Sequence, residues 1–139
     1  MNLAKKVIDK MIEKDAFSKW LGIQVLEISS NLCKVQLKVR SEMTNGFNIA
    51  HGGISYSLAD SALAFAANSD GIKSLSIETT ISHTKKVETG DIITATTCEI
   101  SKNSKYAEYK INITNQNNIQ IAHFRGKVYR TKNEWFPKN

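Results

Sequence analysis

The stretch that decides the fold runs from Ile54 to Asn68 and reads ISYSLADSALAFAAN. Ten of its fifteen residues are apolar, many of them alanine, and Asp60 is its only charge. Two glycines precede it, and the run from Asn68 to Gly71 contains stop signals for a helix. Because a helix that is apolar almost all round belongs inside a protein, we expect a buried central helix, roughly 22 Å long at about 1.5 Å per residue.

The segments before this helix indicate a surface helix followed by a hairpin. Apolar residues between Leu3 and Ile12 recur at helical spacing, which predicts an amphipathic helix over about residues 2–15. Between Cys33 and Val39 apolar and polar residues alternate, as in a strand with one buried face. Leu21 to Ile28 is its expected hairpin partner, joined through Ser29, Ser30 and Asn31.

The second half of the chain is predicted to form strands separated by turns. Four segments alternate apolar with polar side chains or are rich in β-branched residues: 75–81, 92–100, 109–114 and 119–130. Consecutive strands most simply pair as an antiparallel meander. An antiparallel sheet that must cover one long apolar helix wraps around it, which predicts the α+β architecture called the hotdog fold.

Length and composition point to one ordinary globular domain. The chain has 139 residues, 41% of them hydrophobic and 23% charged, so residues 1–139 are expected to form a single domain. The first residues lack the apolar stretch of a secretory signal, and the least charged stretch, 49–69, is a poor membrane span. Cys33 and Cys98 lie far apart, and both are expected to be reduced. We expect a cytoplasmic protein with no membrane partner.

The charge balance favours polyanionic partners without naming one. Nineteen Lys and Arg against thirteen Asp and Glu give a net charge of +6. A phosphate-bearing cofactor fits this charge, as does a basic protein without any such ligand. Nucleic acid is disfavoured because the basic residues are spread over the strands. The three histidines fall on separate segments with no carboxylate at ligand spacing, so we expect no metal.

Asp60 is the residue that most suggests chemistry. It lies among leucines and alanines, where desolvation disfavours a charged carboxylate unless a partner or a ligand-filled pocket accompanies it. The alternative is a structural role, as a cap or as the partner of a lysine across an interface. A functional carboxylate is the sharper hypothesis.

The His51-Gly52-Gly53 run at the start of the helix is the second feature. Free N–H groups at a helix N-terminus can polarise a carbonyl, although simple turn chemistry uses the same residues. Gly52 and Asp60 lie about 12 Å apart along a helix, whereas a reacting carbonyl must lie about 3 Å from both. We therefore predict a homodimer whose sites are built across the interface, with Gly52 of one subunit facing Asp60 of the other.

The run from Asn45 to Asp60, NGFNIAHGGISYSLAD, resembles the hotdog-fold acyl-CoA thioesterases, in particular the PaaI-type group associated with phenylacetyl-CoA and related thioesters. The likeness continues through residues 76–81, Gly90-Asp91 and the final strands, and it covers about residues 15–130. The resemblance implies hydrolysis of a small aryl- or acyl-CoA thioester. It also implies no cofactor beyond the coenzyme A of the substrate, and a dimer of dimers with sites between chains.

The resemblance further implies a role for each matched residue. Asp60 matches the catalytic carboxylate, nucleophile or general base toward water, and Gly52 matches the backbone donor that polarises the thioester carbonyl. Asn45 matches the polar residue that helps to position water or the carboxylate. His51 lies beside the oxyanion donor, where it is expected to orient groups rather than transfer protons. Ser76 falls where some members carry a water-orienting Ser or Thr.

The sequence departs from the family after the strand that contains Ile81. Relatives often carry an aromatic residue and a Pro-containing turn there, whereas this chain reads SHTKKV, which makes His83 a candidate to line the pocket. The lysines of this run fit a solvated turn as well as a phosphate site. The candidates to bind the coenzyme A phosphates are Lys85 and Lys86, or Arg125 and Lys127 on the last strand.

Three functions are compatible with these residues. The first is a thioester hydrolase that uses Asp60 and Gly52. The second is a hotdog hydratase or dehydratase, an enzyme class that usually pairs a catalytic histidine with a carboxylate. The third is a non-catalytic module that binds acyl-CoA or a nucleotide, in which the lone carboxylate has no obvious use.

Overall fold

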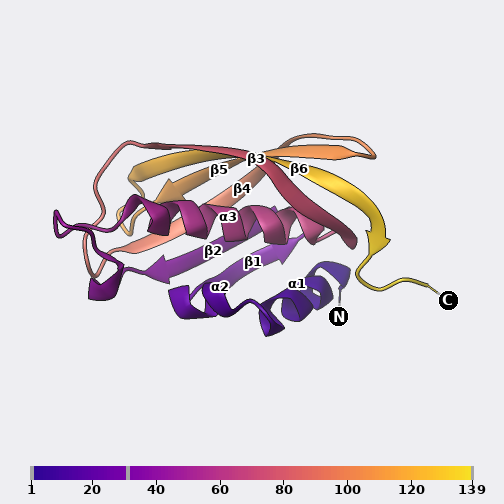
Figure 1. The fold of residues 1–139 in the computed structure, drawn as a ribbon, viewed down its shortest axis with the longest axis horizontal. Coiled ribbons are helices and arrows are strands. Elements are labelled where there is room, and N and C mark those ends of the chain that lie inside the picture. The colour runs from indigo at the N-terminus through magenta and orange to yellow at the C-terminus, as the bar shows by residue number, and fades with distance from the viewer. Residues whose placement is uncertain (1, 31, 139) are drawn as a thin grey trace.

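The computed structural model describes residues 2–30 and 32–138 (Figure 1). Its helices are α1 (Leu3–Glu13), α2 (Ala16–Leu21) and α3 (Gly52–Asn68), with a short 3-10 turn at Ser41–Met43. Its strands are β1 (Gln24–Ser29), β2 (Leu32–Lys38), β3 (Ile72–His83), β4 (Ile92–Lys102), β5 (Tyr106–Thr114) and β6 (Gln120–Glu134).

The central helix and the sheet form the arrangement that the sequence predicts. The strands make one antiparallel sheet in the order β1-β2-β4-β5-β6-β3, and α3 runs along its inner face, through the centre of the molecule in Figure 1. Leu58, Leu63 and Phe65 of α3 are fully buried. Burial of such side chains stabilises the fold by about 1.5–3 kcal/mol each. The α+β hotdog expectation is confirmed.

The expected meander holds for only part of the sheet. β4, β5 and β6 pair in sequence, but β3 pairs with β6, so that Ile81 lies opposite Phe124, while β4 pairs with β2. The expectation was wrong only for β3, because α3 carries the chain across the sheet to its far edge before β3 begins. The segment after β3 then returns to the start of α3 and the end of β2. The Ala50 N–H donates to the Val87 carbonyl oxygen, and the Gly90 N–H donates to the Val39 carbonyl oxygen.

The N-terminal helix ends earlier than predicted, and a second short helix follows it. Asp15 caps α2 by accepting the Ser18 N–H at 2.9 Å, and Gly22 ends α2 in a left-handed conformation with φ of 73°. Leu21 therefore belongs to a helix instead of the predicted strand. The predicted turn residue Asn31 lies outside the described residues.

One edge of the sheet is apolar and open. The edge strand β3 exposes Leu75 by 67% and Ile77 by 54%. Open apolar edge strands are sites where another chain can add to a sheet. The two cysteines are free, as expected. Within residues 2–30 and 32–138, no helix has the length and apolar character needed to span a membrane.

Candidate active site

The first turn of α3 presents an unused backbone donor. His51 caps the helix, and its Nδ1 accepts the Gly53 N–H at 2.9 Å. The Ile54 N–H donates to the His51 carbonyl oxygen at 2.9 Å. The N–H of Gly52 has no acceptor in the described part of the chain. Because the helix dipole places partial positive charge at this end, the Gly52 N–H can polarise a carbonyl.

The loop before α3 holds Asn45 close to this donor. The Asn45 Oδ1 accepts the N–H groups of Phe47 at 2.9 Å and Ile49 at 3.5 Å, which fixes the side chain. Its amide nitrogen has no bonding partner among residues 2–30 and 32–138 and can donate to water or to a carboxylate. Asn45 and Gly52 line one cavity of about 360 Å³.

The segment after Ile81 lines the same cavity with residues 83–87, which include His83, Lys85 and Lys86. A Cβ atom added to Gly52 would lie 3.2 Å from the His83 Nε2. Glycine therefore lets the His83 ring approach the helix start closely. His83 was a candidate to line the acyl pocket, and the structure places it at the backbone donor.

Asp60 lies two turns further along α3, in a different cavity of about 390 Å³. Ser76, predicted from its place on the strand, lines this cavity too. Most of the remaining wall is apolar and includes Met11, Leu63, Leu75, Val128 and Trp135. In the described part of the chain the Asp60 carboxyl has no hydrogen bond or ion pair, and burial raises its pKa above the ordinary value. The carboxylate thus does not cap an element of its own chain.

The predicted catalytic residues therefore fall into two groups within one chain. Asp60 and Ser76 share one cavity, whereas Asn45 and Gly52 share the other. This separation agrees with the spacing along α3, about 12 Å between Gly52 and Asp60. One chain does not bring the carboxylate to the backbone donor.

Two of the predicted phosphate-binding residues lie apart from both cavities. Arg125 and Lys127 project from the outer face of β6, since the residue between them, Gly126, faces the helix. Arg125 forms an ion pair with Glu108 at 2.6 Å, and the Lys127 Nζ lies 5.0 Å from the ring centre of Tyr106.

Sequence analysis missed two residues that line the Asp60 cavity. Met11 comes from α1, and Trp135 follows β6 near the C-terminus. The only sequence signal for Trp135 was a large aromatic side chain that needs burial. Among residues 2–30 and 32–138, no group of three potential metal ligands comes together.

Comparison with known proteins identifies the family of this chain. Residues 47–122 match the family model of the thioesterase superfamily. The acyl-coenzyme A thioesterase PaaI of Escherichia coli is 37% identical over 120 residues, which span 86% of each chain. The structure of PaaI from the phenylacetic acid degradation operon of E. coli superposes with a TM-score of 0.92, at 34% identity, over 94% of this chain and 95% of that chain.

A second solved structure, the TT0310 protein of Thermus thermophilus, has a TM-score of 0.82 at 29% identity, over 85% of this chain and 99% of that one. These matches favour a thioester hydrolase over a hydratase and over a non-catalytic module. The chain therefore belongs to the thioesterase superfamily, as a PaaI-type member with the hotdog fold.

Proposed function

We propose that this protein hydrolyses a small aryl- or acyl-CoA thioester to a carboxylic acid and free coenzyme A. The observation that carries the proposal is the Asp60 carboxyl, which has no partner among residues 2–30 and 32–138 and is desolvated in a mostly apolar cavity. The Gly52 N–H at the start of the same helix also has no acceptor among these residues. The proposed route requires no metal ion. The two free thiols, those of Cys33 and Cys98, support action in the cytoplasm, where thiols stay reduced.

The chemistry follows from these two groups. The Gly52 N–H binds the thioester carbonyl oxygen and stabilises the negative charge that develops on it. Asp60 either removes a proton from the attacking water or attacks the carbonyl carbon itself, which gives a mixed anhydride that water then opens. In both routes the carbon–sulfur bond breaks and the sulfur leaves as the coenzyme A thiol. Asn45 and Ser76 orient the water or the carboxylate.

The working site is formed by two chains, with Asn45 and Gly52 from one protomer and Asp60 and Ser76 from its partner. The two cavities of a single chain support this arrangement, because each contains only half of the required groups. The open apolar edge of β3 provides a surface for pairing. Two-fold pairing produces two equivalent sites, and two such dimers associate further.

Loss of the carboxylate is the first test. Asp60→Asn should lower kcat by about 10²–10⁴ while leaving the fold intact, because the amide neither accepts a proton nor attacks. Release of coenzyme A thiol from a panel of aryl, short-chain and long-chain acyl-CoA thioesters measures this. The matched control is Asp9→Asn, which removes an exposed carboxylate paired only with Lys5 on α1. Wild-type turnover in Asp60→Asn would contradict the assigned role.

The backbone donor can be removed without breaking the helix. Gly52 is the first residue of α3, a position where proline is favoured, and the extended backbone of His51, with ψ of 137°, suits a following proline. Gly52→Pro deletes the N–H and should lower kcat by about 10²–10³. Gly52→Ala is the control, because it also places a carbon near His83 but keeps the N–H. Equal losses in the two variants would argue against the donor.

Complementation tests the two-chain site. Asp60→Asn and Asn45→Ala are each expected to be inactive, but co-expressed chains form mixed dimers in which one of two sites has both native residues. Random association should restore about one quarter of wild-type activity. If each site were formed within one chain, mixing the two variants would restore no activity. An inactive mixture of folded, associated chains would therefore contradict the two-chain site.

The phosphates of coenzyme A are assigned to Lys85 and Lys86. Both are exposed and line the cavity of Gly52, which neither Arg125 nor Lys127 lines. Lys86 also forms an ion pair with Glu88 at 3.3 Å on the protein surface. Neutralising the two lysines should raise KM and leave kcat nearly unchanged, because the phosphates are distant from the reacting carbon. The comparison is Arg125→Ala with Lys127→Ala. A larger rise of KM in the Arg125→Ala, Lys127→Ala protein would assign the phosphate site to β6 instead.

A further inference from the structure

The cavity around Asp60 has an aromatic wall that the proposed chemistry does not use. Trp135 lines the cavity immediately after β6. Its backbone N–H donates to the Gly71 carbonyl at 2.9 Å, and its Nε1 donates to the Asn68 Oδ1 at 2.9 Å. The Lys73 Nζ lies 5.0 Å from the centre of the indole ring. The ring is thus held at several points although it lies near the end of the chain.

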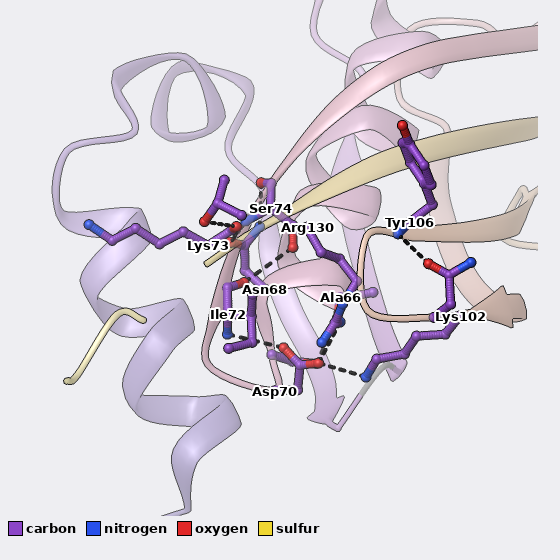
Figure 2. A network of polar contacts seen from close by, with 12 residues as sticks. Ala66, Asn68, Asp70, Ile72, Lys73, Ser74, Lys102, Tyr106 and Arg130 are labelled. Atoms are coloured by element: carbon purple, nitrogen blue, oxygen red, sulfur yellow. Dashed lines mark hydrogen bonds and ion pairs between the residues drawn. The ribbon is translucent and has the colours of Figure 1, made fainter. Parts of the chain in front are cut away.

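Asn68 makes this position rigid. It is only 1% exposed, and its amide nitrogen donates to the carbonyls of Ala64 at 2.8 Å and Ser74 at 3.1 Å. Its Oδ1 accepts the Ser74 N–H at 2.8 Å in addition to the indole N–H (Figure 2 shows Asn68 beside Ser74). Because a buried, saturated amide cannot rotate without losing these bonds, it fixes the orientation of the indole. Asn68 ends the same helix that carries Asp60.

The apolar part of the remaining wall comes from four separate elements, beside polar residues that include Lys73, Ser74 and Ser76. Met11 is on α1, Leu63 on α3, Leu75 on β3 and Val128 on β6. With a volume of about 390 Å³ the cavity has room for a six-carbon chain or a phenyl ring. An acyl group whose carbonyl lies at Asp60 would find apolar side chains and the Trp135 ring on the walls of the same cavity. An acetyl group is too short to pack against these side chains and gains no binding energy from them.

We infer that Trp135 is a specificity-determining residue, against which the acyl group of the substrate packs, so that its ring sets how strongly a large acyl group is preferred over acetyl. The inference rests on the proposed function, since it places the thioester at Asp60. It goes further in assigning the acyl pocket to the C-terminal segment and α1. Met11 lies on the same cavity, and its flexible thioether adapts to the ring edge.

Fluorescence gives a direct test of contact, because the chain has only two tryptophans. In a Trp20→Phe, Asp60→Asn protein, Trp135 is the sole tryptophan and substrate is not consumed. Phenylacetyl-CoA should change its emission saturably, hexanoyl-CoA less so, and acetyl-CoA least. The matched control is Trp135→Phe, Asp60→Asn, which keeps Trp20, an exposed ring beside Phe17 and Arg40. Equal responses of Trp135 to the three thioesters, or a response confined to Trp20, would overturn the inference.

Kinetics separates a specificity role from a structural one. Trp135→Leu should lower the ratio of kcat/KM for phenylacetyl-CoA to that for acetyl-CoA by about tenfold, whereas Trp135→Phe keeps most of it. Trp20→Leu should leave the ratio unchanged. An unchanged ratio in active Trp135→Leu would refute the assignment while leaving the proposed function intact. If the wild type hydrolyses none of the thioesters, the proposed function itself fails. If Trp135→Leu does not fold, the fluorescence titration decides whether the acyl group contacts Trp135.

Discussion

At the scale of single residues, Asp60 combines a functional advantage with a cost in stability. Its carboxyl is half-buried in an apolar cavity, and desolvation raises its pKa because the charged form is the one that burial disfavours. A base whose pKa lies closer to neutral accepts a proton more readily. The same desolvation means that ionising Asp60 opposes folding.

The pH dependence of activity should reflect this raised pKa. Asp60 acts in its ionised form, so kcat/KM should fall on the acid side as the carboxyl is protonated. The acid limb should lie above the ordinary range of an aspartate, which is about 3.9. A pH profile measured with an aryl-CoA thioester checks this. An acid limb at or below the ordinary value would show that another group controls the rate.

Stability should change in the opposite direction. Because the pKa of Asp60 is higher in the folded state than in the unfolded state, its contribution to stability is fully present at low pH and is lost as pH rises through the folded value. Asp60→Asn should therefore raise Tm at neutral pH, and the gain should vanish below pH of about 4. Thermal unfolding of the wild type and of Asp60→Asn, at neutral pH and below pH of about 4, measures this difference in Tm. A lower Tm at neutral pH would point to an unrecognised partner of the carboxylate.

At the scale of elements, an ion cluster ties together segments that are far apart in sequence. Asp70 follows α3, and its Oδ2 binds the Lys102 Nζ at 2.6 Å and an Arg130 guanidinium nitrogen at 2.7 Å (Figure 2). Its Oδ1 accepts the Ile72 N–H at 3.1 Å. The cluster therefore joins the start of β3 to the end of β4 and to β6, beside the segment that carries Trp135.

Asp70 should make a contribution to stability that depends on pH. Burial alone would raise its pKa, but the hydrogen bonds from Lys102 and Arg130 hold the pKa below the ordinary value. Its contribution is thus present above about pH 4 and is lost as pH falls through the lower folded value. Asp70→Asn should destabilise the protein at neutral pH by about 1.5–3 kcal/mol. Urea unfolding at neutral and at acid pH measures the loss of stability in Asp70→Asn and its dependence on pH. A loss of the same size in acid would show that the contribution of Asp70 is not ionic.

The close contact between β6 and α3 depends on a glycine. A Cβ atom on Gly126 would lie 2.5 Å from the Leu63 Cδ2, inside the buried core. Gly126→Ala should therefore cost about 1–3 kcal/mol through overpacking and alter the wall of the Asp60 cavity. Gly46→Ala is the control, because nothing lies within 4 Å of its added carbon. Equal stability of the two variants in denaturant unfolding would show that Leu63 moves aside without strain.

At the scale of the whole molecule, the proposed two-chain site makes activity depend on association. Ile77 lies on the open edge of β3 and is 54% exposed, but it lines no cavity that contains a proposed catalytic residue. Ile77→Lys should leave the chain folded, separate the protomers and abolish turnover, because a charge on an edge strand opposes pairing. Light scattering with size exclusion, run beside the activity assay, checks this. Ile100→Lys changes an exposed apolar residue on β4 and should leave both the association of the protomers and the turnover unchanged. An active dimer of Ile77→Lys would rule out this edge as the interface.

Local patterns in the sequence were enough to predict the central helix and most of the strand segments, and they indicated the candidate site residues. The apolar run around Asp60 predicted a buried helix because burial on all sides requires apolar side chains on all faces, and α3 is buried in this way. Alternation predicted the strands because a half-buried strand repeats every two residues. His51, Gly52 and Asn45 came from the motif before the helix, and the structure places Asn45 and Gly52 in one cavity.

Only the tertiary structure decided which of these elements meet. Nothing in the alternation of residues 75–81 shows that β3 joins the far edge beside β6, because pairing depends on where α3 delivers the chain. The division of the predicted residues between two cavities, and the arrival of Met11 and Trp135 beside Asp60, likewise depend on contacts between distant segments. Sequence by itself determined α3 and most of the strand segments, because the periodicity of apolar residues along a helix or a strand is local. The neighbours of each residue depend on how the whole chain is packed.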